Sequence, residues 1–176
     1  GVGGDATGIV LGGVGAGVGG ELRGIAVSAG GVGVGGSARG VKVAGIGIGA
    51  GGDMTGVQVA GVGMGAGGTL RWVSVAGVGI GAGRIEGLAA AAAVGAQETS
   101  GIVLAPAYFR IVDGGEARGV NLSAWNDVRG TQRGLAVGLF NYARVLDGVQ
   151  VGLLNYAGNK PRGTRLLPLL NYARDR

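Results

Sequence analysis

Apolar and polar residues alternate along the chain in a short unit whose phase changes once. In one clear unit, Val41 and Val43 alternate with Lys42, as on a strand with one buried face. The alternation breaks at two small residues and resumes at Ile46 in the opposite phase, before a glycine-rich turn. We therefore expect two short strands in each unit, with Lys42 and its counterpart Gln58 in solvent. The residues that would share one interior are Val41, Val43, Ile46, Ile48, Val57, Val59, Val62 and Met64.

The unit recurs every sixteen residues through the first part of the chain and every fourteen to eighteen residues later. A glycine opens each apolar run, and Trp72 stands in its place once. These landmark positions are Gly8, Gly24, Gly40, Gly56, Trp72, Gly87, Gly101, Gly119, Gly134 and Gly148, with a last copy around Gly163. About eleven units of roughly sixteen residues account for all 176 residues, and such periods are typical of stacked repeat proteins.

A change of phase at a small-residue step is what a corner in the backbone produces. Each unit would then form one coil of two short strands, and parallel stacking of the coils would bury a continuous aliphatic ladder. The sequence therefore favours an all-β fold, a β-solenoid. The alternative is an antiparallel β-barrel or meander, built from the uncharged runs of about ten residues between charged turns. We rank it second because the same turn closes every unit.

Glycine content divides this single repeat domain, residues 1–176, into three stretches. Residues 1–84 hold 32 of the 45 glycines, residues 85–100 are alanine-rich, and residues 101–176 carry aromatic and basic side chains. The middle stretch would be a degenerate coil or a short helix. In the first stretch, glycines such as Gly47 would point outward. Tight coils and corners favour such glycines, and a bare face for self-association is the competing interpretation.

The C-terminal units share the phrase LFNYA or LLNYA. Its asparagines, Asn141 and Asn155, take the slot that holds Gly47 and Gly63 in earlier units. Asparagine replaces glycine well where φ is positive, and asparagines on successive coils can stack into amide ladders. Both explanations give these residues a structural role, which we favour over a binding role.

The same units resemble a known family. The segments GLAVGLFNYA (134–143), GVQVGLLNYA (148–157) and RLLPLLNYA (165–173) look like the GVQ-x-G-L-x-N-Y-A units of short-repeat bacterial surface proteins. The resemblance is clearest over residues 101–176 and continues more loosely as GVQVAGVG (56–63), because Gly-Ile or Gly-Met replaces Asn-Tyr in the first half. It implies export and a place at the bacterial cell surface or outer membrane, without an assigned activity.

The composition lacks the commonest groups of enzyme active sites. The chain has no histidine and no cysteine, so its serines have no histidine to activate them and no thiolate chemistry is available. The acidic residues are scattered singly on turns, without calcium or zinc spacing. We therefore expect a non-enzymatic protein with no cofactor and no metal ion, which acts as a structural or adhesive scaffold.

The net charge of +5 comes entirely from the C-terminal part. Residues 1–109 carry five basic and five acidic side chains, whereas residues 110–176 carry ten basic and five acidic ones. Arginines and aromatic rings are interleaved there, which suits anionic glycans or lipid headgroups and indicates no specific nucleic acid. A membrane-embedded or membrane-associated β assembly that binds such lipid or glycan is therefore the alternative function. The candidate contacts are Arg118, Arg129, Arg133, Arg144, Arg162 and Arg165.

One row of charged and polar residues would follow an edge of the stacked coils. It consists of the residue before each landmark position: Thr7, Arg23, Arg39, Thr55, Arg71, Glu86, Ser100, Arg118, Arg133, Asp147 and Arg162. The row could form a basic edge for anionic groups. Because Thr, Glu and Asp interrupt it, we favour a role in keeping an apolar array soluble and in preventing edge-to-edge pairing.

Overall fold

The computed structural model describes residues 1–174, and almost all of them lie in β-strands wound into stacked coils, so the fold is a β-solenoid. The chain forms two compact units, Gly1–Ala91 and the part from Ala92 onward. The first contains β1 (Ala6–Gly12), β2 (Gly15–Val18), β3 (Leu22–Ser28), β4 (Gly31–Val34), β5 (Ala38–Ala44), β6 (Gly47–Ala50), β7 (Met54–Ala60), β8 (Gly63–Ala76) and β9 (Gly79–Ala90). The second contains β10 (Ala93–Val137), β11 (Phe140–Ala157), the 3-10 helix η1 (Arg162–Thr164) and β12 (Leu166–Ala173).

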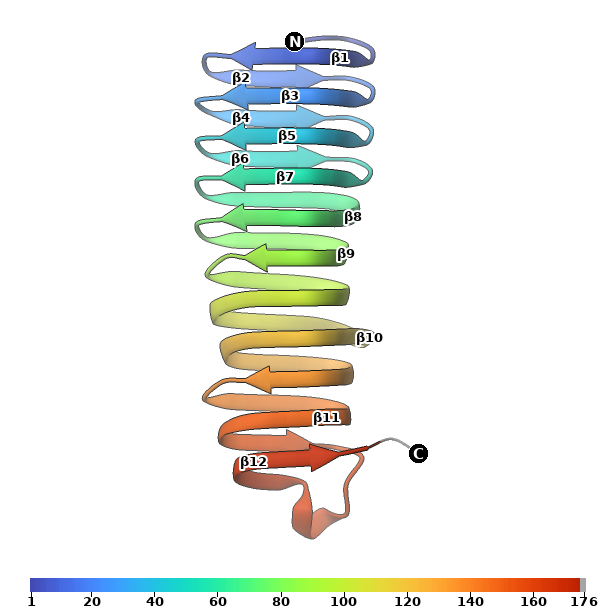
Figure 1. Cartoon of the computed structure of the whole chain (residues 1–176), viewed down its shortest axis with the longest axis vertical. Coiled ribbons are helices and arrows are strands. Elements are labelled where there is room, and N and C mark those ends of the chain that lie inside the picture. Colours follow the sequence, from blue (N-terminus) through green and yellow to red (C-terminus); the bar gives the residue numbers. More distant parts are fainter. Residues whose placement is uncertain (175–176) are drawn as a thin grey trace. The chain divides into compact units, whose positions relative to one another are not determined.

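In the first unit every strand pairs in parallel with the strand one coil further along (Figure 1). Strands β1, β3, β5, β7, β8 and β9 follow one another on one side of the coils, and β2, β4, β6 and β8 on a second side. The register is the sixteen-residue repeat itself, so Lys42 pairs with Gln58 and Gln58 with Ser74. This parallel pairing confirms the predicted solenoid and rules out the antiparallel barrel or meander for this unit.

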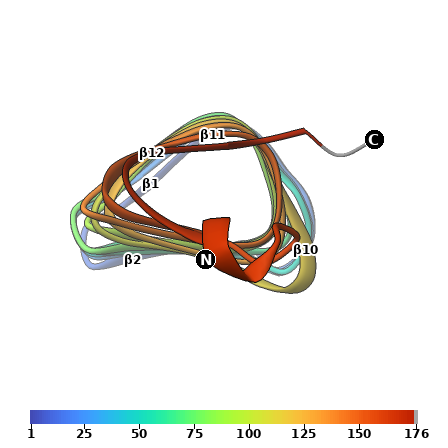
Figure 2. The ribbon, with the colours of Figure 1, turned by 90° about the horizontal axis from the view of Figure 1, so that it is seen from below.

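The landmark glycine of each unit forms a corner. Gly24, Gly40 and Gly56 have φ of 133°, 110° and 115°, a range that L-residues seldom adopt. The coil turns there, so a short charged stretch before the glycine forms a third side (Figure 2). We call the stretch after the glycine the first side and the stretch that contains β2, β4 and β6 the second side. The predicted two-strand coil thus has three sides.

Trp72 takes the same corner conformation, with φ of 82°, although it carries a Cβ. Because its side chain is largely exposed, Trp72→Gly should relieve strain with little loss of packing. We expect this variant to retain its stability or to gain up to about 1 kcal/mol. Gly56→Ala should instead lose about 1–3 kcal/mol, because its Cβ would collide with the Gly40 carbonyl oxygen. Thermal melts followed by circular dichroism compare the two variants, and equal losses would show that the corner does not require glycine.

The first side turns inward the residues that were predicted to face solvent. Lys42 and Gln58 are fully buried, whereas Val41 and Val57 are each 37 % exposed. Of the predicted interior residues, Ile48 and Met64 are buried, and those that face outward are Val41, Val43, Ile46, Val57, Val59 and Val62. The inward residues Lys42, Ala44 and Ile48 share one parity, and Ile46 between them faces outward at a corner, so the predicted register of the first side is wrong.

The narrow interior explains this inversion. The inward positions of the first side hold no bulky apolar residue: they are alanines, such as Ala26, Ala44, Ala60 and Ala76, and polar residues, such as Lys42 and Gln58, all buried. A coil of sixteen residues leaves little room between its sides, so bulky β-branched side chains on the first side fit better outside. Larger apolar residues enter only elsewhere on the coil, for example Met54. The valines look like a buried face in the sequence only because their neighbours are polar.

A polar column inside the first unit compensates for the burial of Lys42. The Lys42 ammonium donates hydrogen bonds to the carbonyl oxygens of Ala38 (3.2 Å) and Thr55 (3.0 Å). Its Nζ also lies 3.3 Å from the amide oxygen of Gln58 when that amide donates to Ser74 Oγ at 2.9 Å. Burial lowers the pKa of Lys42 to about 8. The column is therefore hydrogen-bonded, but among residues 1–174 its lysine has no carboxylate partner.

The outward glycines of the second side were predicted correctly, but the fold does not explain all of them. A Cβ added to Gly33 or Gly49 would meet no atom within 4 Å. At Gly45 and Gly61, by contrast, it would collide with the backbone of the preceding coil. Tight coils therefore require glycine at the corners. Steric crowding does not explain the outward glycines of the second side, such as Gly33 and Gly49.

The second unit is also built of stacked coils, and its side chains are longer. Strand β11 pairs in parallel with β10, with Trp125 beside Phe140 and Gly134 beside Gly148. The alanine-rich residues 85–100 lie largely in strands and contain no helix, which confirms the interpretation as a coil. Strand β12 runs antiparallel to β11, because the segment that contains η1 reverses the chain. The last copy of the repeat thus covers the edge of β11 instead of forming another parallel coil.

The asparagines of the C-terminal phrase form the amide ladder that the sequence suggested. Asn126 Nδ2 donates to Asn141 Oδ1, and Asn141 Nδ2 donates to Asn155 Oδ1, both at 2.7 Å. Asn171 Nδ2 donates to the Asn155 carbonyl at 3.1 Å. All four side chains are buried, and none of the four residues has a positive φ. Stacking, and not backbone conformation, accounts for asparagine at these positions.

Candidate functional site

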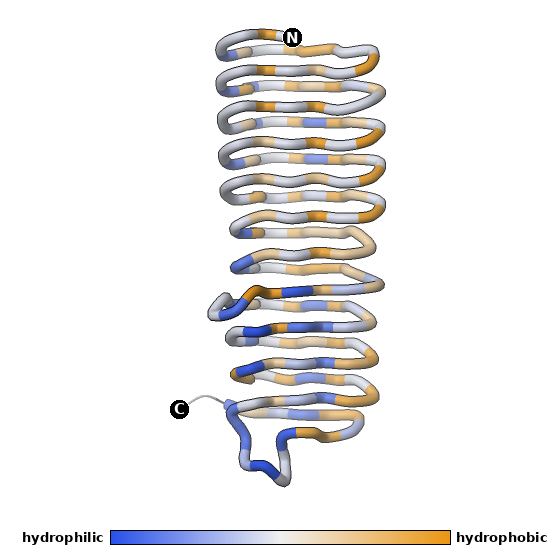
Figure 3. The backbone as a smooth tube through the Cα atoms, turned by 180° about the vertical axis from the view of Figure 1, so that it is seen from behind, coloured by the Kyte–Doolittle hydropathy of each residue, from blue (hydrophilic) through white to orange (hydrophobic). Residues whose placement is uncertain are grey.

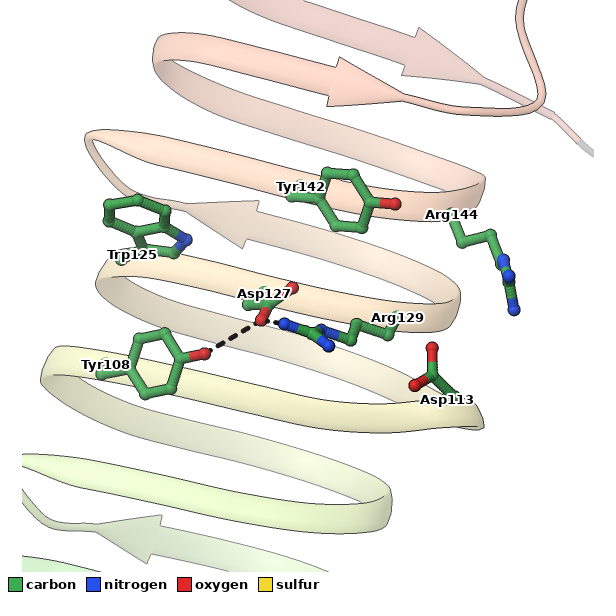
Figure 4. A pocket seen from close by; sticks show the side chains of 7 residues that line it. All are labelled: Tyr108, Asp113, Trp125, Asp127, Arg129, Tyr142 and Arg144. Atoms are coloured by element: carbon green, nitrogen blue, oxygen red, sulfur yellow. Dashed lines mark hydrogen bonds and ion pairs between the residues drawn. The ribbon is translucent and has the colours of Figure 1, made fainter.

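A surface pocket of about 540 Å³ lies in the second unit (Figure 4). Its walls combine aromatic rings with carboxylate and guanidinium groups. The residues that line it are Tyr108, Asp113, Trp125, Asp127, Arg129, Tyr142 and Arg144.

The local sequence places these side chains on one face. Outward positions on a strand are two residues apart, and Trp125, Asp127 and Arg129 follow that spacing. The next coil repeats it with Phe140, Tyr142 and Arg144. The parallel register sets Trp125 beside Phe140 and Asp127 beside Tyr142, so two rows of outward residues form one continuous surface.

Asp127 is the fixed centre of the pocket. The residue is only 8 % exposed, and its Oδ2 accepts hydrogen bonds from the Tyr108 hydroxyl at 2.9 Å and from Arg129 Nε at 3.2 Å. Burial, together with the hydrogen bond to Asp127, raises the pKa of Tyr108. Tyr108 therefore stays protonated at neutral pH and keeps donating. These three side chains are held in place before any ligand arrives.

The aromatic rings provide flat apolar walls. Trp125 is 53 % exposed and packs against Phe140, with ring centroids 5.6 Å apart. Tyr142 stacks on Tyr156 with centroids 5.1 Å apart and planes 6° from parallel. The rings of Trp125 and Tyr142 each contact a ring of the next coil, so they are already ordered before a ligand binds. Binding to their outward faces therefore costs little conformational entropy.

The charges of the pocket balance. Asp113 and Asp127 offset Arg129 and Arg144, and Arg144 lies toward the end opposite Trp125 (Figure 4). Within residues 1–174, the side chain of Arg144 makes no hydrogen bond or ion pair, so its guanidinium is available to a ligand. An apolar ring at one end and hydrogen-bonding groups at the other suit a ligand with both flat apolar faces and hydroxyl groups.

The six arginines predicted as anionic contacts do not form one surface. Arg129 and Arg144 meet in the pocket, but Arg118 and Arg133 contact Glu116 at 2.8 Å and 2.6 Å. The hydrogen bond from Arg118, with a further contribution from Arg133, lowers the pKa of Glu116. Two others lie after β11: Arg162 begins η1, and Arg165 Nε donates to the Lys160 carbonyl at 2.7 Å.

The charged row before the landmark positions is also largely ion-paired. Arg71 pairs with Glu86 of the neighbouring coil at 2.8 Å, and Arg23 pairs with Glu21 at 3.0 Å. Exposed pairs of this kind contribute little to stability, and they neutralise the edge. The row therefore agrees better with a solubilising role than with a basic binding edge.

Asp127 is the residue that sequence reasoning missed. The aromatic residues and some arginines were noted, but the aspartate carries no motif by itself. The signal that could have found it is the pair of aligned patterns Trp-x-Asp-x-Arg (125–129) and Phe-x-Tyr-x-Arg (140–144), one unit apart. Period-two spacing and parallel stacking together place these side chains on one outward face.

Neither a metal site nor a membrane-spanning helix is evident in the described part of the chain. Residues 1–174 contain no group of three or more Asp or Glu side chains that could hold a metal ion. They also contain no helix that is long and apolar enough to cross a membrane. No family model, no curated protein and no solved structure matches this chain.

Proposed function

We propose that this protein is a non-enzymatic, exported scaffold of the bacterial surface that adheres to glycans through the pocket around Trp125 and Asp127. The observation that carries the proposal is the combination of an exposed tryptophan with a prearranged set of Asp127, Tyr108 and Arg129 hydrogen-bonding groups. Sugar rings have apolar faces that stack on aromatic rings and hydroxyl groups that bind to carboxylate and guanidinium. The resemblance of residues 134–173 to exported surface repeats supports the location.

The charge balance bears on the kind of glycan. Asp113 and Asp127 would oppose a highly charged phosphate or sulfate group, because like charges at close range repel. A neutral or weakly acidic saccharide fits the pocket better, with Arg144 available for one carboxylate or hydroxyl group. Binding should therefore change little between low and high salt, in contrast to the salt-sensitive binding expected from a purely basic surface.

Removal of the Trp125 ring should strongly weaken adhesion. Trp125→Ala should lower the affinity for the polysaccharide that retains the wild type most strongly by at least about tenfold, because the stacking surface is lost. The matched control is Trp72→Ala, which removes the other tryptophan of the chain from an exposed corner of the first unit. Affinity electrophoresis of the full chain in gels that contain dextran, mannan, xylan or alginate measures retention directly. A Trp72→Phe protein then carries Trp125 as its single tryptophan, and its fluorescence reports on the pocket during titration.

Loss of binding by Trp125→Ala alone would support the proposal. Equal loss by both tryptophan variants, or no retention on any polysaccharide, would refute glycan binding. The location is tested separately by protease treatment of intact producing cells, in which a surface protein is digested and an internal one is protected.

A further inference from the structure

The outward face of the first side in the first unit is an unbroken aliphatic sheet. Its residues form two rows, one at the first and one at the third residue after each landmark position. The rows are aligned by the parallel register and comprise Ile9, Ile25, Val41, Val57 and Val73, and Leu11, Val27, Val43, Val59 and Val75. No charged residue interrupts either row, which leaves a large apolar surface in contact with solvent.

An exposed corner row extends this surface. Ile46, Val62 and Val78 follow the first side at the next corner and are 61 %, 48 % and 59 % exposed. Together with the two rows they expose on the order of 700 Å² of apolar area, above the ~300–600 Å² of the largest patch on a typical monomer. A stable interface buries about 800 Å² on each partner. The patch therefore has the size of one half of a protein–protein interface.

The shape of the surface limits what can cover it. The rows are ridges of mostly β-branched side chains held by a continuous parallel ladder, so the face is regular and rigid. A second sheet of the same kind packs on such ridges at about 10 Å with interdigitated side chains. Another copy of this chain supplies a face with the identical spacing between rows.

The charges around the face favour a second copy over a lipid surface. Residues 1–91 carry five basic and four acidic side chains, and one of the five, Lys42, is buried. The tube coloured by hydropathy shows few hydrophilic positions in this unit (Figure 3). Arg23 and Arg71 are paired with glutamates, so the unit offers little cationic attraction to anionic headgroups. Low net charge also leaves little repulsion between two copies.

We propose that this aliphatic face binds a second copy of the chain through the same face, giving a two-fold symmetric dimer. A two-fold interface is self-complementary, so a single patch suffices and the assembly closes at two copies. The pocket in the second unit plays no part in the contact, so this inference stands independently of glycan binding.

Sedimentation equilibrium of the full chain tests the proposal with matched variants. Val41→Arg combined with Val57→Arg places two charges on the aliphatic face. Gly33→Arg combined with Gly49→Arg adds the same charge to the second side, where a Cβ meets no atom within 4 Å. The wild type should be a dimer at micromolar concentration. The valine variant should dissociate at least about 50-fold more readily, and the glycine variant should remain dimeric.

Circular dichroism confirms that each variant is folded. If the arginine variant unfolds, Val41→Thr with Val57→Thr preserves the shape of the side chains and should still weaken the dimer. A wild type that stays monomeric up to about 100 μM would overturn the proposal. So would dissociation by the glycine variant alone. Flotation of a monomeric wild type with phosphatidylglycerol vesicles, lost in the valine variant, would show that lipid and not a second copy covers the face.

Discussion

Replacement of Ala60 by aspartate should unfold the first unit, whereas the same change at the adjacent Val59 should be tolerated. Ala60 is 3 % exposed and points into the narrow interior, while Val59 points outward on the next position of the same strand. An unpaired carboxylate in that interior costs several kcal/mol, and the extra volume adds strain. In an array where each coil is held by its neighbours, such a loss is shared by the adjacent coils.

The two variants differ only in the side of the sheet, so they form a controlled pair. Chemical denaturation at a concentration where the chain is monomeric should show a loss of at least about 3 kcal/mol for Ala60→Asp and less than about 1 kcal/mol for Val59→Asp. The sequence placed Val59 inside, and that register would predict a large loss for Val59→Asp. A large loss for Val59→Asp with a small one for Ala60→Asp would restore that register.

The second large effect concerns Lys42, whose burial makes stability depend on pH. Below about pH 8 the lysine is protonated in both the folded and the unfolded chain, so the full cost of the buried charge is present. Between pH 8 and its ordinary pKa of 10.5 the folded protein releases the proton while the unfolded chain keeps it. Because the unfolded state then binds more protons, the free energy of unfolding rises with pH across this window.

Comparison with Lys42→Met isolates this contribution. Methionine keeps the unbranched shape without a charge, so the variant should be more stable than the wild type near pH 7, by about 2 kcal/mol after allowance for partial screening. The difference should shrink as the pH approaches 10.5. Denaturation curves of both proteins at pH 7, 8.5 and 10 measure it, and subtraction removes the other titrating groups. A constant difference would mean that Lys42 titrates normally. Arg39→Met, at an outward position of the same strand, serves as the control.

The candidate site was partly accessible from the sequence. Aromatic and basic enrichment after residue 100 indicated the correct half of the chain, and Arg129 and Arg144 were among the candidate contacts. The other four arginines are not in the pocket, because enrichment reveals neither ion pairs nor chain direction: Glu116 binds Arg118 and Arg133, and Arg162 and Arg165 lie in the segment after β11. Asp127 was missed because its role depends on Tyr108, which precedes it by nineteen residues and reaches it only through stacking.

The repeat period and the β-solenoid were determined by the sequence itself. A constant period of sixteen forces identical local conformations, and stacking is the arrangement in which such units satisfy their backbone hydrogen bonds. The same regularity indicated the amide ladder, since asparagines one unit apart, such as Asn141 and Asn155, must meet when coils stack in register. The outward position of Gly49 followed from the same period.

Only the tertiary structure decided which face of the first side turns inward. Alternation along a strand is symmetric under exchange of its two faces, so Val41-Lys42-Val43 fits either register. Hydrophobicity favoured valine inside, but the small cross-section of the coil admits alanine on this side and holds Lys42 through corner carbonyl groups. The sequence therefore determined the coil and its period through local repetition, and the three-dimensional packing of a narrow interior determined which residues became the core and which became the exposed aliphatic face.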